Sequence, residues 1–152
     1  MPIVKEYIYK MQMNDYIKSY LSEKPKYRLM FDLSSSLDVV SVDVGAYIAD
    51  ALQAKTQDLN LNMYASDAIR EMIRQHTHEH SVYGRYVALC NIGILFEPAL
   101  VFNLETIIEQ TSKDELLIIQ AKGCIANERF FFLSQQDNLS FSLKNLTYIT
   151  IE

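Results

Sequence analysis

The residues best placed to do chemistry follow an apolar segment in the middle of the chain. Residues 85–100 read RYVALCNIGILFEPAL, and the stretch from Tyr86 to Leu89 predicts a buried strand that runs into a sharp turn and then a short helix. In nucleotide-binding α/β domains a strand of this layout presents a carboxylate to a metal ion, but Cys90 stands at that position here. The segment therefore has the layout of a site without the acid that its chemistry requires.

A phosphate-binding loop is also missing from the sequence. Such a loop needs glycines where backbone N–H groups approach the phosphates, followed by a Lys and then a Ser or Thr. The four glycines are Gly45, Gly84, Gly93 and Gly123, and none is followed by that pair. The residues from Asp32 to Ser36 (DLSSS), where the loop is expected, fit a flexible turn better than an anion site. We therefore expect no nucleotide cofactor and no catalysis that depends on one.

The histidines suggest a metal site as one alternative. All three lie in the segment His76-Thr77-His78-Glu79-His80, and on a helix His76 and His80 would share a face, as zinc ligands often do, with Glu79 beside them. The polarity of this segment suits an exposed helix end or loop equally well. The sequence leaves both interpretations open.

A nuclease site is a second alternative. Gln120-Ala121-Lys122, at the end of an apolar strand, resembles the acid-x-Lys signature of restriction-type nucleases, some of which use Gln. The acid that precedes this strand would be Asp114 or Glu115, at a helix end rather than on a strand. The enzyme alternative thus depends on Asp114, Gln120 and Lys122 coming together.

Composition limits the class of protein further. The formal net charge is −5 and no strong basic cluster stands out, which disfavours nucleic acid as a direct ligand. Cys90 and Cys124 have no metal-ligand spacing and fit unpaired thiols in a reducing compartment. Because no membrane span or secretory apolar core stands out, we expect a cytoplasmic protein without a membrane partner.

The predicted elements alternate between helices and strands over the first two thirds of the chain. Helices are expected over residues 3–22, over 44–54 with Asp43 as the cap, over 67–75 with Ser66 as the cap, and from Asn103 to about 114. Strands are expected over residues 27–33, 37–42, 86–89 and 116–120, and a loop over 76–84. Helices between strands favour crossover connections and a parallel sheet.

The last part of the chain changes to short segments rich in β-formers, over residues 129–133, 139–143 and 146–151. The fold class that follows is a three-layer α/β fold with a mostly parallel sheet flanked by helices and a C-terminal antiparallel β meander or hairpin. We expect one domain over 1–152, made of an N-terminal helix (1–24), an α/β core (26–124) and a β-rich part (125–152).

Residues from Val87 onward, VALCNIGILFEPALVFNLETIIEQTSKDELLIIQAKG and on through ERFFFLSQ, resemble the corresponding part of the BrxF family. Residues 38–53 resemble the second strand and helix of that family. BrxF proteins are small P-loop ATPase-like proteins of bacteriophage-exclusion (BREX) defence systems. The resemblance implies a P-loop-like scaffold and a place in a prokaryotic anti-phage system.

The departures from the family decide what the resemblance implies about activity. No Gly-rich, Lys-containing loop lies between Leu29 and Val42, and Cys90 replaces the expected acid, so that Asn91 and Glu97 are the matching polar positions that remain. We therefore expect a degenerate, non-catalytic accessory or assembly subunit that contacts other proteins of a defence complex. A metal-dependent nuclease and a self-associating module, whose C-terminal edge strands pair between copies, remain as alternatives.

Overall fold

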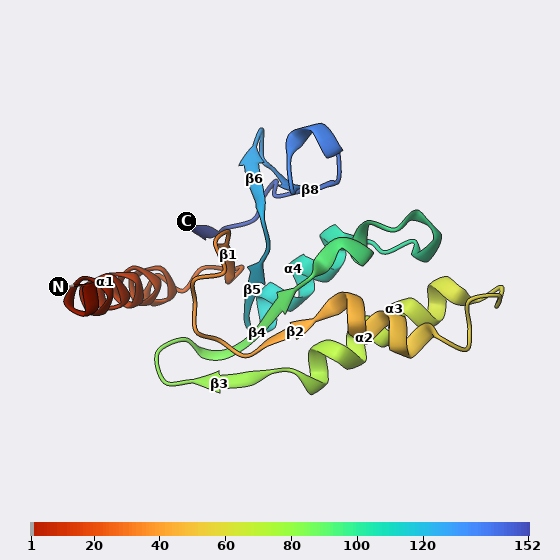
Figure 1. Ribbon diagram of the computed structural model, residues 1–152, viewed down its shortest axis with the longest axis horizontal. Helices are drawn as coiled ribbons and strands as arrows, with labels where there is room; N and C mark the ends of the chain where they lie inside the picture. The colour runs from red at the N-terminus through yellow and green to blue at the C-terminus, as the bar shows by residue number, and fades with distance from the viewer. Residues whose placement is uncertain (1) are drawn as a thin grey trace.

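The computed structural model describes residues 2–152, which form helices, a large sheet and a small sheet (Figure 1). The helices are α1 (Pro2–Ser22), α2 (Val44–Leu52), α3 (Leu61–Gln75) and α4 (Leu104–Asp114), with short 3₁₀ helices η1 (Ile92–Phe96), η2 (Pro98–Leu100) and η3 (Gln135–Asp137). The strands are β1 (Leu29–Asp32), β2 (Ser41–Asp43), β3 (His78–His80), β4 (Gly84–Cys90), β5 (Leu116–Gln120), β6 (Gly123–Ala126), β7 (Arg129–Phe132), β8 (Ser140–Ser142) and β9 (Ile149–Ile151).

The large sheet is parallel except for one strand. Its order is β2-β4-β5-β1-β9, and every neighbouring pair in that order is parallel. The short strand β3 pairs with the first half of β4 in the antiparallel direction. The small sheet, with order β6-β7-β8, is antiparallel. The predicted α/β class, with a mostly parallel sheet and a C-terminal antiparallel unit, is confirmed.

Both faces of the large sheet are covered, as expected for a parallel sheet. Along β1 the side chains of Leu29 and Phe31 enter one apolar cluster, and that of Met30 enters the other. The first cluster contains residues of α2, α3, α4 and the small sheet, whereas the second is covered by α1 and by the segment that follows β1. In Figure 1, α1 accordingly lies apart from the other three helices.

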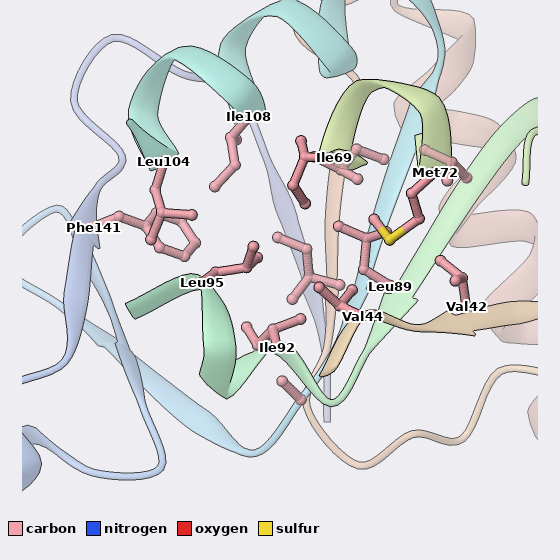
Figure 2. Packing of buried hydrophobic residues seen from close by; sticks show 14 of the residues in the cluster. Val42, Val44, Ile69, Met72, Leu89, Ile92, Leu95, Leu104, Ile108 and Phe141 are labelled. Carbon is pink, nitrogen blue, oxygen red and sulfur yellow. The ribbon is translucent and has the colours of Figure 1, made fainter. Parts of the chain in front are cut away.

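The first cluster is the larger and fixes the helices on the sheet. Figure 2 shows Ile69 and Met72 of α3 and Ile108 of α4 converging toward Leu89 of β4. The small sheet joins the same cluster through Phe130, whose ring stacks on that of Phe31 at a centroid distance of 4.9 Å. Aromatic stacking of this kind adds to burial, so the small sheet is part of the core.

The N-terminal helix α1 docks on the opposite face through its C-terminal half. Ile17 is fully buried, and the Tyr20 hydroxyl donates to the carbonyl of Tyr27 at 2.7 Å and accepts from the amide of Leu29 at 3.2 Å. Burial raises the pKa of the Tyr20 hydroxyl, so it stays neutral as a donor. Within residues 2–152 no helix combines the length and the apolar character that a membrane crossing needs.

Three predictions about the first two thirds of the chain were wrong in detail. The helix predicted to start after Ser66 begins at Leu61, because Leu61 and Tyr64 also pack against the core. The predicted loop over 76–84 contains β3, and of the strand predicted over 37–42 only its end lies in β2. The segment before β2 instead folds over the sheet, for reasons given below.

One prediction about the C-terminal part was also wrong. The first two predicted strands form β7 and β8 of the small sheet, but residues 149–151 leave it and pair in parallel with β1. The short alternating segment Ile149-Thr150-Ile151 buries Ile151 beside α1, so apolar burial in the large sheet decides its partner.

Candidate functional site

The carboxyl ends of the parallel strands form the candidate site. The register aligns Asp43 of β2 with Cys90 of β4, Cys90 with Gln120 of β5, Gln120 with Asp32 of β1, and Asp32 with Ile151 of β9. In open α/β sheets, ligands bind outside this end of the strands. The row of polar residues there is therefore the part of the fold where a ligand is expected.

Asp32 is the most buried polar group of this row, with no solvent-exposed surface. Its Oδ1 accepts hydrogen bonds from the amide of Ser36 at 3.0 Å and from the Ser36 hydroxyl at 3.2 Å. Its Oδ2 accepts from the amide of Leu37 at 2.8 Å and from Nε2 of Gln120 at 2.9 Å. Four donors from this same chain thus surround the carboxylate, which explains how it is tolerated in the interior.

Gln120 locks the segment 33–40 onto the sheet. Its Nε2 donates to Asp32 and also to the carbonyl of Leu37 at 3.1 Å, so both amide hydrogens are used. Farther along, the amide of Val40 donates to the hydroxyl of Tyr86 at 3.1 Å. The segment that follows β1 therefore runs across the face of the sheet that α1 covers, and it begins where the sequence would place a phosphate-binding loop.

Cys90, at the position where the sequence layout predicts an acid, is half-buried. Its Sγ lies 3.5 Å from the carbonyl oxygen of Val42 and 3.5 Å from the hydroxyl of Ser41. Neither partner is a base, and activation of a thiol needs a base or a cation beside it. The contacts of Cys90 are those of a packing residue between β4 and β2.

Asn91 ties the end of β4 to the start of α2. It has a left-handed backbone, with φ of 51°, and its Nδ2 donates to Oδ1 of Asp43 at 2.7 Å while its carbonyl accepts from the amide of Gly45 at 3.1 Å. Asp43 also caps α2 through the amide of Ala46, and this bond, followed by that from Asn91, lowers the pKa of the Asp43 carboxyl. A Cβ at position 45 would lie 2.5 Å from Nδ2 of Asn91, so the hydrogen bonds of Asn91 with Asp43 and Gly45 favour glycine there.

Glu97, the third position of the family pattern, lies six residues beyond Asn91 and is exposed. Its carboxylate accepts from the amide of Ala99 at 3.3 Å and caps η2, where Pro98 occupies the first position. The structure thus brings Cys90 and Asn91 to the carboxyl end of β4 and gives Glu97 a capping role.

The two histidines of the metal hypothesis lie in different elements. His76 ends α3, with Nδ1 2.9 Å from the carbonyl of Met72, whereas His80 lies in β3. Nδ1 of His80 accepts from the amides of Val82 and Tyr83, at 2.9 and 3.1 Å. They therefore share no helix face, and across the described chain, from residue 2 onward, no group of three or more His, Cys, Asp or Glu residues is placed to hold a metal ion.

The residues of the nuclease alternative are likewise not brought together. Asp114 ends α4 before β5 and Lys122 follows β5, so the length of that strand, about 13 Å for its five residues, separates them. The buried carboxylate of Glu115 forms an ion pair with Arg85 at 3.3 Å, at the amino end of β4. Only Gln120 of this set lies in the candidate site, where it binds Asp32.

A cavity with a mixed polar and apolar lining lies beside the site, under the middle of α1. It measures about 260 Å³ and is lined by Asn14 of α1, by Ser36 and Asp38, and by His80 and Tyr83. The Tyr83 hydroxyl donates to Oδ1 of Asn14 at 3.2 Å, and the Tyr83 ring stacks on that of His80. Burial lowers the pKa of His80 despite the opposing carboxylate of Asp38, which favours the neutral ring.

Sequence reasoning named Gln120 for the nuclease alternative, but it missed the pairing of Gln120 with Asp32. The only signals were an acid at the end of one buried strand and an amide at the end of another, and nothing local says that these strands are neighbours. Comparison with known proteins returned no match among family models, curated proteins or solved structures. The resemblance of residues 38–53 and 87–135 to BrxF proteins thus stays a prediction.

Proposed function

We propose that this protein is a non-catalytic, P-loop-like accessory or assembly subunit that acts through contacts with other proteins. The resemblance to BrxF gives the proposed setting, a prokaryotic anti-phage defence complex in the cytoplasm. The geometry at the end of β1 and β5 supports the non-catalytic part of this proposal.

The single observation that carries the proposal is that donors of this same chain already surround the Asp32 carboxylate. A nucleotide phosphate needs free backbone N–H groups and a cation beside it. Here the amides of Ser36 and Leu37 point at the Asp32 carboxylate, and that carboxylate is an anion at the centre of the region. A phosphate group would have to break these bonds and approach a buried negative charge, which is unfavourable.

Partly exposed apolar side chains of α1 support the second part of the proposal. Ile8, Tyr9, Met11 and Tyr16 are each about half exposed, between 48% and 51% of their surface. Exposed apolar residues that gather on one element are typical of protein contact surfaces. This helix, which covers only part of the sheet, is therefore a contact element in the proposed role.

Isothermal titration calorimetry with ATP and Mg²⁺ tests the first part. We expect no binding at micromolar nucleotide, and a micromolar Kd would refute the closed-site argument. In parallel, a cleavage assay on plasmid DNA with Mg²⁺ compares the wild type with Lys122→Ala. Cleavage that is lost in this variant would favour the nuclease alternative.

Co-expression with the proteins encoded beside its gene, followed by size-exclusion chromatography, tests the second part. We expect co-elution with at least one neighbour, such as a methyltransferase, a phosphatase-like protein or a large ATPase of a defence system. Elution of every neighbour without this chain would count against the assembly role.

A further inference from the structure

The strand β9 forms an open edge of the large sheet. It pairs with β1 on one side, and over residues 2–152 no strand pairs with its other side. The carbonyl of Ile151 faces β1, because it accepts from the amide of Leu33 at 2.8 Å. Since successive residues of a strand direct these groups to opposite sides, the N–H and C=O of Thr150 point outward.

A groove lies on each face of the sheet along this edge. On the α1 face a cavity of about 240 Å³ is lined by Tyr9, Met13 and Tyr16. On the opposite face a cavity of about 350 Å³ is lined by Leu33, Cys124, Ile125 and Tyr148. Thr150 and Glu152 line both cavities, so the two grooves meet at β9.

This arrangement fits the addition of one more strand. An added strand would bond to the outward groups of Thr150, and its successive side chains would alternate between the two faces and enter the two grooves. Edge strands are usually protected by Lys, Pro or a bulge. Ile149, Thr150 and Ile151 provide no such protection.

Charge indicates the chemistry of the added segment. Among the residues whose side chains the structure describes, Glu152 is the only charged one that lines either groove, and the chain carries a formal net charge of −5. A second copy would bring the same acidic charge, and its own residues 146–152 (LTYITIE) contain no basic side chain. A Lys or Arg next to alternating apolar residues complements the edge better.

We propose that β9 accepts an extended segment of a partner protein by strand addition, and that this segment carries apolar side chains on alternate residues and a basic residue opposite Glu152. The inference rests on the proposed function, since it names the surface through which an assembly subunit would hold its partner.

Selection from a displayed library of random twelve-residue peptides tests the proposal, with synthetic copies of the enriched peptides as probes. We expect enrichment of alternating apolar residues with Lys or Arg. Thr150→Pro removes the outward donor at an edge position that tolerates Pro, and should weaken binding of the probes at least tenfold. Thr150→Val keeps the backbone N–H and should bind as the wild type does.

Charge reversal provides a second, independent measurement. Glu152→Lys should weaken the basic probes about tenfold, whereas Glu79→Lys, an exposed acid of β3 outside both grooves, should leave them unchanged. No enriched peptide, or equal binding by Thr150→Pro and Thr150→Val, would overturn the proposal. A dimer seen by light scattering and broken by Thr150→Pro would assign the edge to a second copy and would also overturn it.

Peptide binding and nucleotide binding test the acceptor edge and the non-catalytic role separately. Nucleotide binding with intact peptide binding would remove the non-catalytic role and leave the acceptor edge. Failed peptide binding without nucleotide binding would remove only the acceptor edge.

Discussion

Replacing Asp32 by Ala should destabilise the fold far more than loss of a small polar side chain usually does. The substitution removes the acceptor of four hydrogen bonds. The donors on Ser36 can turn to water because that residue is exposed, but the amide of Leu37 and one amide hydrogen of Gln120 stay buried. An unpaired buried donor costs about 1–3 kcal/mol, so two of them give about 2–6 kcal/mol, and we expect about 3 kcal/mol since the segment 33–40 can shift.

Urea unfolding followed by far-UV circular dichroism measures this change, because the chain has no Trp to report by fluorescence. Asp38→Ala is the matched control, since Asp38 is an exposed acid of the same segment and should change the unfolding free energy by less than about 0.5 kcal/mol. A loss below about 1 kcal/mol for Asp32→Ala would show that the network does not hold this segment closed.

A double-mutant cycle isolates the bond between the two strand ends. Asp32→Ala and Gln120→Ala are combined, and a hydrogen bond to a charged group predicts a coupling free energy of about 2 kcal/mol. Gln120→Glu should be worse than Gln120→Ala, because it places a second carboxylate against Asp32 and against the carbonyl of Leu37. A coupling near zero would contradict the proposed lock.

Two further predictions concern groups near the site. Gly45→Ala should lower the unfolding free energy by about 1–3 kcal/mol, because the new Cβ would lie 2.5 Å from Nδ2 of Asn91. In the background of Asn91→Gly, which removes that atom, the same change should cost less than half as much, and equal costs would exclude the clash. Burial lowers the pKa of His80, so the unfolded state binds the proton more readily than the folded state does. Stability is therefore fully present above about pH 6.5 and is lost as the pH falls through the folded pKa. In thermal melts at a series of pH values, the Tm of His80→Asn should fall less with pH than that of the wild type, since the Asn amide oxygen can still accept from Val82 and Tyr83.

The elements that the sequence predicts well are those fixed by neighbours along the chain. The caps Asp43 and Asn103 accept from amides three residues on, at 2.9 and 3.2 Å, so short-range chemistry alone sets the starts of α2 and α4. The strand β5 is buried at every position, and its continuous apolar run indicates a sheet that is covered on both faces.

The features that the sequence does not reveal depend on partners far along the chain. The strand β3 consists of His78, Glu79 and His80, a polar composition that indicates a loop until the pairing with β4 is known. The strand β9 has the same alternation whether it joins the small sheet or β1. Asp32 and Gln120 are separated by 88 residues, so the closed site follows from the strand order and not from any local motif.

The strand order also explains why the site is closed by the course of the chain and not by one substitution. From the end of β1 the chain must cross β5 and β4 to reach β2, a lateral distance of about 14 Å for three strand spacings, within residues 33–40. Extended chain covers this distance, but a helix of the same eight residues spans only about 12 Å and would leave nothing for turns, and a crossover between parallel strands normally needs a dozen or more residues. The segment is therefore held flat on the sheet by Asp32 and Gln120. Cys90→Asp places an acid at the position where the resemblance to BrxF predicts one. This variant should still not bind nucleotide, because the segment after β1 leaves no room for a phosphate loop and its helix.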